Sequence, residues 1–382
     1  MFLTYCLVTV SIVGAYVYLI ISIMEKWSEL PGHQITDEAI GYPSVSFIIP
    51  ARNEAKYIGK CIDHLIIQSD RFPGIVKEII IVDDHSEDDT AEIVQTKLYP
   101  SLQLLYLKDH LVGPRESYNA FKKLALNLGL AHARGDYIIQ MDADTYCGPD
   151  YLEVVLSTLG KGEFDMVAAP VCFDSEGGSA FQDFQALDFV GMMALTAVGI
   201  DSGHWHLSNG ANLIYRRGIV SFEDSGYASG DDIFAIQKVA RDSKDNITFL
   251  KDKRAIVRTP AETTLSGFIS QRLRWATKNK GLKEKGLWVI MATPYIMVMW
   301  FLVHFVGYFF FGPITLVMAL MQLMAKMGID YLYLKELSIY FEIEAAMKNF
   351  WYCSLAHILY IGIIGTMSFF VRRYNWKGRR VS

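Results

Sequence analysis

The chain has 382 residues, of which 52% are hydrophobic and 20% are charged, and its net charge is −5. This length accommodates one catalytic domain of roughly 250 residues together with membrane helices. The apolar fraction is high for a soluble enzyme. The sequence has no basic stripe with interleaved aromatic residues, so we expect no nucleic-acid partner.

The N-terminal segment, residues 1–24, contains no charged side chain. As a helix it is long enough to cross about 30 Å of hydrocarbon. A secretory signal would carry Lys or Arg ahead of a shorter apolar run that ends in small residues. We therefore predict a retained transmembrane anchor in preference to a cleaved signal.

The middle of the chain, residues 43–262, has the pattern of an α/β domain. Short β-branched runs alternate with amphipathic segments, which implies right-handed βαβ units and a mostly parallel sheet. Ligands of such sheets bind beyond the carboxyl ends of the strands. The predicted strands cover residues 45–50, 78–82, 103–107 and 136–141, and the predicted helices cover residues 55–68, 89–98 and 118–133.

The first acidic cluster, Asp83 and Asp84, closes the predicted strand 78–82. Two carboxylates at a strand tip suit recognition of a ribose or a base edge. Asp and Ser are also favoured in turns and at helix N-caps, which would explain the cluster without a ligand. Both interpretations stay open from the sequence.

The second cluster, Asp142 and Asp144, follows the predicted strand 136–141. Alternating side chains in an extended turn would bring both carboxylates near one point, where they could ligate Mg2+ or Mn2+. Such ions are usually shared between protein carboxylates and substrate phosphates. The alternative is a polar loop with an Asp-Thr turn.

Two further polar groups follow. A loop at residues 209–212 (NGAN) precedes a predicted strand at 213–215 and is either a turn or part of a sugar site. Asp231 and Asp232 open an amphipathic helix after Gly230. The helix dipole stabilises carboxylates at this end, and the same field would keep a general base ionised.

The segment 263–286 has apolar and cationic faces and is predicted to be an interfacial helix carrying Gln271, Arg274 and Trp275. On such a helix Arg binds headgroups and Trp lies in the aromatic belt. Alternatively, Arg274 offsets the charge of a leaving diphosphate while Trp275 stacks on a sugar or an acceptor. Both interpretations can hold on one helix.

The C-terminal region, residues 287–371, is predicted to form two or three membrane segments. Residues 288–325 lack charge and would form a helix of about 57 Å, which exceeds one crossing, and Gly312-Pro313 interrupts them. Basic residues before this region and in the tail 372–382 place the middle domain and the tail in the cytoplasm. Because that requires an even number of crossings, we expect residues 313–327 to be re-entrant or interfacial.

The ordered D, D, D, QxxRW set resembles the membrane-anchored branch of the family 2 glycosyltransferases, over residues 45–275. Cellulose and hyaluronan synthases and ceramide glucosyltransferases are relatives of this kind. The resemblance implies a GT-A nucleotide-sugar domain flanked by transmembrane helices, a UDP-sugar donor, and Mg2+ or Mn2+. One departure is Gly-Asp-Asp at 230–232, where many members have Glu-Asp.

The resemblance also implies a role for each matching residue. The catalytic residues would be Asp232 as general base, Asp231 and Arg274; the donor-binding residues Pro50, Arg52, Glu54, Asp83, Asp84, Lys122 or Lys123, Asp142 and Gln271; the acceptor-binding residues Asn209, Gly210, Asn212 and Trp275; and the metal ligands Asp142 and Asp144.

The resulting hypothesis is an inverting hexosyltransferase of the plasma (inner) membrane with a cytoplasmic catalytic domain. It would move a sugar from a UDP-sugar to a lipid or lipid-linked hydroxyl, or to a glycan. A processive polysaccharide synthase is the first alternative. It is disfavoured because the predicted membrane segments are few for a channel that would carry the product. A non-catalytic membrane scaffold is the second, disfavoured because no acidic position of the set is replaced.

Overall fold

The computed structural model consists of two compact units, which we describe separately. The sheet unit contains residues 31–173, 199–260 and 373–382, and the helical unit contains residues 1–30, 174–198 and 261–372. Residues 174–198 had been predicted inside the α/β domain. The lysines at 278–283 and part of the basic tail lie outside the described residues. The structure describes residues 1–32, 41–111, 118, 120–162, 164–174, 178–222, 230–242, 246–277, 284–370, 374–376 and 379–381.

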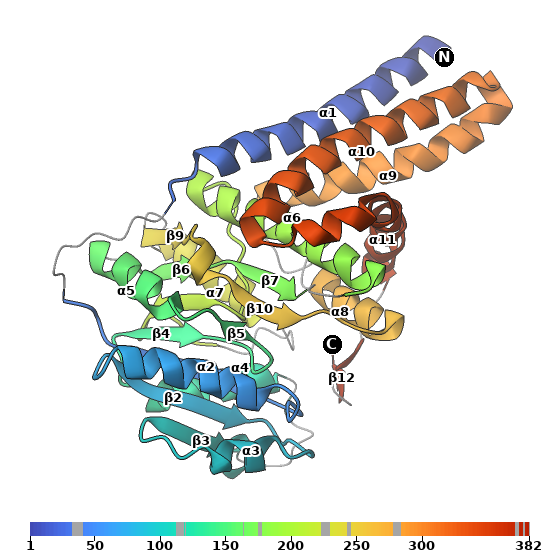
Figure 1. Ribbon diagram of the computed structural model, residues 1–382. Coiled ribbons are helices and arrows are strands. Elements are labelled where there is room, and N and C mark those ends of the chain that lie inside the picture. Colours follow the sequence, from blue (N-terminus) through green and yellow to red (C-terminus); the bar gives the residue numbers. More distant parts are fainter. Residues whose placement is uncertain are drawn as a thin grey trace. The chain divides into compact units, whose positions relative to one another are not determined.

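The sheet unit is built on a seven-stranded sheet with the order β3-β2-β1-β4-β8-β6-β9 (Figure 1). Strand β1 is parallel to β2 and β4, β2 to β3, and β6 to β9, whereas β8 is antiparallel to both neighbours. The prediction of a mostly parallel sheet is therefore confirmed. The strands are β1 (Val45–Ala51), β2 (Val76–Asp83), β3 (Leu102–Tyr106), β4 (Tyr137–Gln140), β6 (Met166–Ala168), β8 (Leu213–Arg216) and β9 (Ile247–Phe249).

A three-stranded sheet, β5-β10-β7, and a hairpin, β11-β12, complete the strands of the described residues. The helices predicted at 55–68, 89–98 and 118–133 are present, each close to its predicted bounds. The elements are β5 (Tyr146–Cys147), β7 (Val171–Asp174), β10 (Val257–Pro260), β11 (Tyr374–Trp376), β12 (Arg379–Val381), α2 (Ile58–Arg71), α3 (Thr90–Thr96), α4 (Phe121–His132), α5 (Tyr151–Lys161), α7 (Asp231–Asp242), and the short 3-10 turns η1 (Leu107–Asp109) and η4 (Lys253–Ala255).

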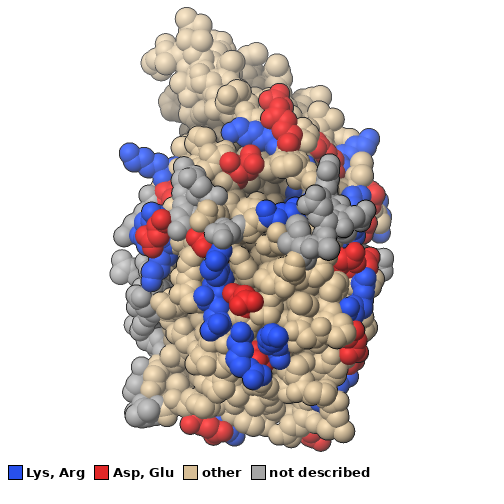
Figure 2. All heavy atoms as spheres, turned by 90° about the vertical axis from the view of Figure 1, so that its left-hand side faces the viewer, with Lys and Arg blue, Asp and Glu red and all other residues tan. Residues whose placement is uncertain are grey.

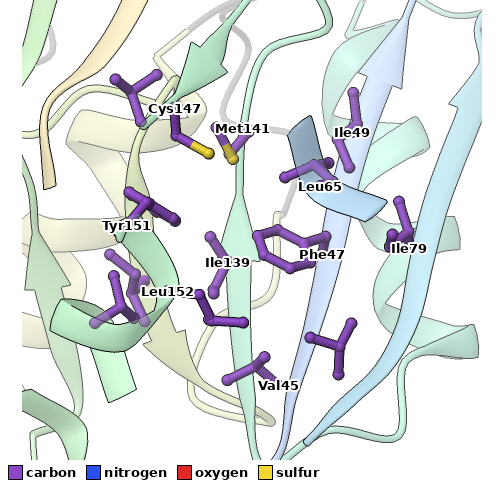
Figure 3. Close-up of a cluster of buried hydrophobic side chains, with 14 of the residues drawn as sticks. Val45, Phe47, Ile49, Leu65, Ile79, Ile139, Met141, Cys147, Tyr151 and Leu152 are labelled. Atoms are coloured by element: carbon purple, nitrogen blue, oxygen red, sulfur yellow. The ribbon is translucent and has the colours of Figure 1, made fainter. Parts of the chain in front are cut away.

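The core of the sheet unit lies on both faces of β1. Figure 3 shows Phe47 of β1 among side chains of β4, α2 and α5, all of them buried. Successive strand residues face opposite sides of a sheet, so Ile48 points to the other face. There α4 approaches closely because it presents Gly129, where a Cβ would lie 2.6 Å from Cγ2 of Ile48. Burial on two faces explains why these strands are apolar throughout.

The helical unit contains α1, α9 and α10 side by side (Figure 1), with α6, α8 and α11. Five helices of the described residues are long and apolar enough to cross a membrane, namely α1, α6, α9, α10 and the segment Glu344–Phe370. The bounds are α1 (Phe2–Glu29), α6 (Ala180–Ser202, with residues 199–202 in the sheet unit), α8 (Leu265–Thr277), α9 (Lys285–Phe311), α10 (Ile314–Phe341), η6 (Glu344–Asn349) and α11 (Phe350–Phe370).

The apolar surfaces of these helices differ. In α6, 83% of the most apolar window is buried inside the protein, so protein contacts cover it. By contrast, α1, α9, α10 and α11 expose large apolar side chains, for example Phe309 at 83%. Figure 2 shows the helix ends at the top of the view without Lys, Arg, Asp or Glu. Contiguous exposed apolar surface of this kind indicates an apolar surrounding such as a bilayer.

The expected short segment at residues 313–327 is corrected by the structure. Helix α10 begins at Ile314 and runs on for 28 residues to Phe341. It continues past Lys326 because that ammonium forms an ion pair with Asp330, one turn further along. Opposite charges that pair within a helix do not end it. Helix α8 is described from Leu265 to Thr277, and residues 278–283 of the predicted segment 263–286 lie outside the described residues.

Candidate active site

Two adjacent loops follow the parallel strands β1 and β2. Asn53 and His85 both adopt left-handed backbone conformations, with φ of 52° and 55°. Such values are uncommon outside Gly, and Asn and His are among the residues that tolerate them. The Asn53 N–H donates to Oγ of Ser86 at 3.0 Å, and the Glu87 N–H donates to Oδ1 of Asn53 at 2.8 Å. The two loops are therefore bound to each other.

Asp83 ends β2, Asp84 begins the second of these loops, and both are buried. The Asp83 carboxylate accepts the Ser86 N–H at 3.2 Å, which is the turn chemistry considered from the sequence. Arg52 is also buried and donates to the carbonyl oxygens of Asp84 at 2.9 Å and His85 at 2.7 Å. Arg52 therefore shapes the loop that presents both aspartates.

Pro50 and Glu54 flank this loop pair. Pro50 lies opposite Val82 in the strand pairing and is partly buried. The Glu54 N–H donates to Oγ1 of Thr90 at 2.7 Å, which fixes the backbone ahead of α2. Asp88, which the motif analysis did not single out, accepts the Ala55 N–H at 3.1 Å. Although burial raises the pKa of Asp88, the bonds from Thr90 and the backbone outweigh it, and the net pKa is lowered.

Asp142 and Asp144 follow β4, and both are partly exposed while Met141, Ala143 and Thr145 are buried. Residues 143 and 144 form a turn, and both carboxylates are partly accessible from solvent. The Thr145 N–H and Oγ1 donate to the Asp142 carbonyl at 3.2 and 2.7 Å, so the Asp-Thr turn is present too. The Asp142 side chain is 36% exposed and remains open to a ligand.

Lys122, in the first turn of α4, connects two of the acidic clusters. Its Nζ lies 2.8 Å from Oδ1 of Asp142 and 3.6 Å from Oδ2 of Asp231. Burial lowers the pKa of this ammonium, but the neighbouring carboxylates raise it more, so the net pKa is raised. Lys122 is therefore a fixed positive charge. Lys123 is buried elsewhere, with its Nζ 5.8 Å from the ring centroid of Phe234.

Asp231 is buried at the start of α7, where Gly230 has φ of 91°. Its Oδ2 accepts a hydrogen bond at 3.2 Å from Nε2 of Gln140, a fully buried residue of β4. Together with Lys122, this amide compensates the Asp231 carboxylate inside the protein, as a buried charge requires. The sequence motifs did not include Gln140, although a polar residue inside a strand that is buried on both faces can indicate a functional site.

Asp232 has a different environment from its neighbour. It is only partly buried. Its Oδ2 accepts the Gly210 N–H at 3.2 Å, and its Oδ1 accepts the Ile233 N–H at 2.9 Å. Both carboxylate oxygens are therefore held in place by backbone N–H groups. Asp232 is thus a partly exposed carboxylate held by backbone N–H groups, whereas Asp231 is buried.

Gly210 lies in the middle of these groups. A Cβ at this position would lie 2.8 Å from Nε2 of Gln140, 3.3 Å from Oδ2 of Asp231 and 3.4 Å from Nζ of Lys122. The loop backbone therefore approaches the charged side chains more closely than any side chain would allow. We call Lys122, Gln140, Asp142, Gly210, Asp231 and Asp232 the acidic cluster.

The side chains of Asn209 and Asn212 form hydrogen bonds within the protein and so fix the conformation of the loop. Oδ1 of Asn209 accepts the Ala211 N–H at 2.9 Å. The Asn212 side chain is buried, donates to the carbonyls of Pro170 and Ala255, and accepts the Tyr151 hydroxyl. Its amide is fully engaged within the protein. We therefore correct the expected acceptor-binding role of Asn212 to a structural one.

The predicted motif of the helical unit lies on α8. Gln271, Arg274 and Trp275 have the spacing i, i+3 and i+4, which places them on one side of the helix. The Trp275 ring lies 5.8 Å from that of Phe189. Oε1 of Gln271 is buried and has no hydrogen-bond partner within the described residues. The motif therefore offers an unpaired acceptor beside a partly exposed indole.

The donor atoms for a metal are few. Within the described residues no group of three or more His, Cys, Asp or Glu side chains could hold an ion. Asp142 and Asp144 supply two partly exposed carboxylates from one loop. Mg2+ and Mn2+ accept such a set when substrate phosphates and water complete the coordination. The residues present fit an ion shared with a diphosphate.

A mostly parallel sheet with carboxylates beyond its strand ends is typical of α/β domains that bind a ligand at that edge. The profile described as "Glycosyl transferase family 2" matches residues 46–220, and the one described as "Glycosyl transferase family group 2" matches residues 137–367. The second match covers more than half of the chain. The chain belongs to family 2 of the glycosyltransferases.

Two curated relatives share part of the sequence. Glycosyltransferase AglE of Haloferax volcanii is 29% identical over 218 residues, which are 55% of this chain and 65% of that protein. Dolichyl-phosphate beta-glucosyltransferase ALG5C of Trichomonas vaginalis is 33% identical over 119 residues, which are 28% of this chain and 33% of that protein. The matches thus span less than two thirds of either relative.

One solved structure resembles nearly the whole chain. The mannosyltransferase PcManGT from Pyrobaculum calidifontis, in complex with GDP-Man and Mn2+, aligns with a TM-score of 0.56. The alignment covers 92% of this chain and 97% of that one at 18% sequence identity. A likeness at this identity establishes the fold.

Proposed function

We propose that this enzyme transfers a hexose from a UDP-sugar to a hydroxyl of a lipid or lipid-linked acceptor, with inversion at the anomeric carbon. The observation that carries the proposal is the acidic cluster. In it Lys122 joins Asp142 to Asp231, and Gly210 joins that pair to Asp232. Three sequence motifs thereby meet at one end of the sheet, where such folds bind ligands.

The donor would lie against the charged groups at the ends of β2 and β4. Asp83 and Asp84 would contact the base and ribose, and Arg52 would act through the loop that it shapes. Lys122 supplies a permanent positive charge for the diphosphate. A divalent ion held by Asp142 and Asp144 would stabilise the negative charge that develops on the leaving diphosphate.

Asp232 would act as the general base. It takes the proton of the acceptor hydroxyl while that oxygen attacks the anomeric carbon from the face opposite the diphosphate. The new carbon–oxygen bond forms as the bond to the phosphate oxygen breaks, and the electron pair leaves with the diphosphate. Inversion follows from this in-line geometry. Asp231, compensated by Gln140 and Lys122, would hold the cluster together without exchanging a proton.

A lipid acceptor is supported by the apolar helices and by a relative whose name specifies dolichyl phosphate. Chondroitin synthase and hyaluronan synthase of Pasteurella multocida also match, each over 11% of its length, so a polysaccharide acceptor is the second candidate. The roles of Gln271, Arg274 and Trp275 at donor and acceptor rest on the motif. A cytoplasmic catalytic domain in the plasma membrane rests on the basic residues flanking the helices.

The test is to incubate the purified full chain with Mg2+ or Mn2+, a panel of UDP- and GDP-sugars and a membrane lipid extract, and to read the products by mass spectrometry. One sugar added to a lipid from a UDP-sugar is the expected result. A ladder of products would identify a polymerase, and a GDP-sugar preference would overturn the donor assignment. Absence of nucleoside diphosphate release with every donor would reject catalysis. Labelling of a cysteine placed at residue 382 from outside intact cells would overturn the orientation.

A further inference from the structure

A buried arginine next to the motif on α8 has no role in the proposed chemistry. Arg272 is 2% exposed, and its Nη1 lies 3.0 Å from Oδ2 of Asp188 on α6. The Nε and Nη2 of Arg272 make no hydrogen bond within the described residues. A guanidinium taken out of water in this way needs strong compensation from its other neighbours.

Aromatic rings supply that compensation. The guanidinium carbon lies 4.4 Å from the ring centroid of Trp275, 5.0 Å from that of Phe268 and 5.5 Å from that of Tyr360. Cation–π attraction is strongest for Trp and grows when the cation is desolvated, as it is here. Trp275 contacts both this guanidinium and the ring of Phe189. Its orientation is therefore tied to the position of Arg272.

The position of Arg272 is set in turn by a chain of buried polar contacts. Oδ1 of Asp188 lies 3.7 Å from Nε2 of His357 on α11, whose Nδ1 lies 3.2 Å from Nζ of Lys326 on α10. Lys326 pairs with Asp330, which accepts the hydroxyl of Tyr16 on α1 at 2.6 Å. Ionisable residues among apolar helices are costly unless paired. The chain thus connects α8 with four other helices.

We propose that Arg272 and Asp188 are positioning residues that fix the rotation of α8 and the plane of the Trp275 indole. If α8 rotated, the guanidinium would leave both Asp188 and the rings, and a buried carboxylate would lose its cation. Gln271 and Arg274 share the helix and are held by the same anchor. The inference rests on the proposed function only for the tests that measure acceptor kinetics.

The discriminating variant is Arg272→Lys. Lysine keeps a positive charge for Asp188 but removes the planar group that stacks on Trp275. The expected result is a KM for the acceptor raised by about ten- to a hundredfold, because small displacements of positioned groups have effects of this size. The KM for the donor and the thermal midpoint stay near wild type. The fluorescence emission of Trp275, obtained by subtracting the Trp275→Phe spectrum, shifts.

A matched control exists on the same helix. Asp183 of α6 is also buried, and its Oδ2 accepts from Nδ2 of Asn349 at 2.6 Å, so it is anchored to a residue outside α8. Asp188→Asn should change Trp275 emission and acceptor KM, whereas Asp183→Asn should change neither. The double variant Asp188→Asn with Arg272→Gln is neutral at both positions. Its thermal stability should return toward the wild-type value, because no buried charge is left alone. The defect in acceptor KM should persist.

The outcomes separate the two proposals. Unchanged Trp275 emission in Arg272→Lys, or equal effects of Asp183→Asn and Asp188→Asn on it, would overturn the positioning role. An acceptor KM within twofold of wild type in Arg272→Lys would overturn it as well. If the wild-type chain transfers no sugar, the proposed function fails, and the emission of Trp275 still decides the positioning role.

Discussion

The adjacent carboxylates Asp231 and Asp232 provide the sharpest test of the proposed mechanism. Each can be changed to Asn, which keeps the shape and removes the negative charge. Asp232 is partly exposed and held by the N–H groups of Gly210 and Ile233, so Asp232→Asn removes the proposed base and one of these two backbone hydrogen bonds. Asp231 is buried beside Lys122, so Asp231→Asn removes an internal counter-charge.

The two substitutions are expected to change different quantities. General-base catalysis is typically worth about 10²–10⁴-fold, or about 2.7–5.4 kcal/mol of activation free energy. Asp232→Asn should lower kcat by that factor and leave the affinity for UDP unchanged. A hydrogen bond to a charged group contributes about 1.5–3 kcal/mol, so Asp231→Asn should lower the free energy of unfolding by that order. Its kcat should fall less than that of Asp232→Asn.

The assay combines UDP release under saturating substrates with UDP binding by calorimetry and thermal unfolding of the same preparations. Each variant thereby controls for the other, since the two positions are adjacent and the substitutions identical. The reasoning is refuted if Asp232→Asn binds UDP normally and turns over at the wild-type rate. It is refuted equally if Asp231→Asn keeps full stability but loses the larger share of kcat.

Three further predictions concern the same unit. Lys122→Met should raise the donor KM by about tenfold or more, since a charged hydrogen bond is lost. Because the pKa of Lys122 is raised, its ion pairs stabilise the fold below the ordinary lysine pKa of about 10.4 and weaken only above it. Unfolding measured as a function of pH tests this. A loss of stability below that pH that is absent in Lys122→Met would contradict it. Gly210→Ala should lower kcat by about tenfold, because the methyl group displaces Gln140 from its hydrogen bond to Asp231; wild-type steady-state kinetics would refute it. Gly129→Ala should lower the free energy of unfolding by about 1–2 kcal/mol through its clash with Ile48, with kcat retained; an unchanged thermal midpoint would show that the helix can shift.

The alternation of short apolar runs with amphipathic segments was sufficient to predict the first strands and helices, because these elements are apolar on the faces that the sheet buries. Helix α6 was not predicted. It is apolar on almost all sides because protein surrounds it, and its sequence therefore shows no 3.6-residue periodicity. Helix α10 was predicted too short because Lys326 reads as the end of an apolar run, while its partner Asp330 becomes visible only on the helix.

The residues of the candidate site were likewise predicted only in part from the sequence. The sequence placed carboxylates after β2, after β4 and at the start of α7, since strand ends and helix starts are local features. It did not distinguish Lys122 from Lys123, which are neighbours in one amphipathic helix. The distinction comes from the rotation of α4 against the sheet, which turns Lys122 toward Asp142 and Lys123 toward Phe234.

By itself, the sequence determined the fold class, the family and the order of the D, D, D, QxxRW set, because these depend on residue type and spacing along the chain. Tertiary structure decided which aspartate is compensated and which is exposed. Gln140 and Lys122 reach Asp231 from β4 and α4, both of which lie far earlier in the chain. The partners of Arg272 come from α6 and α11 for the same reason. A buried charge is defined by its neighbours in space, and no local pattern records them.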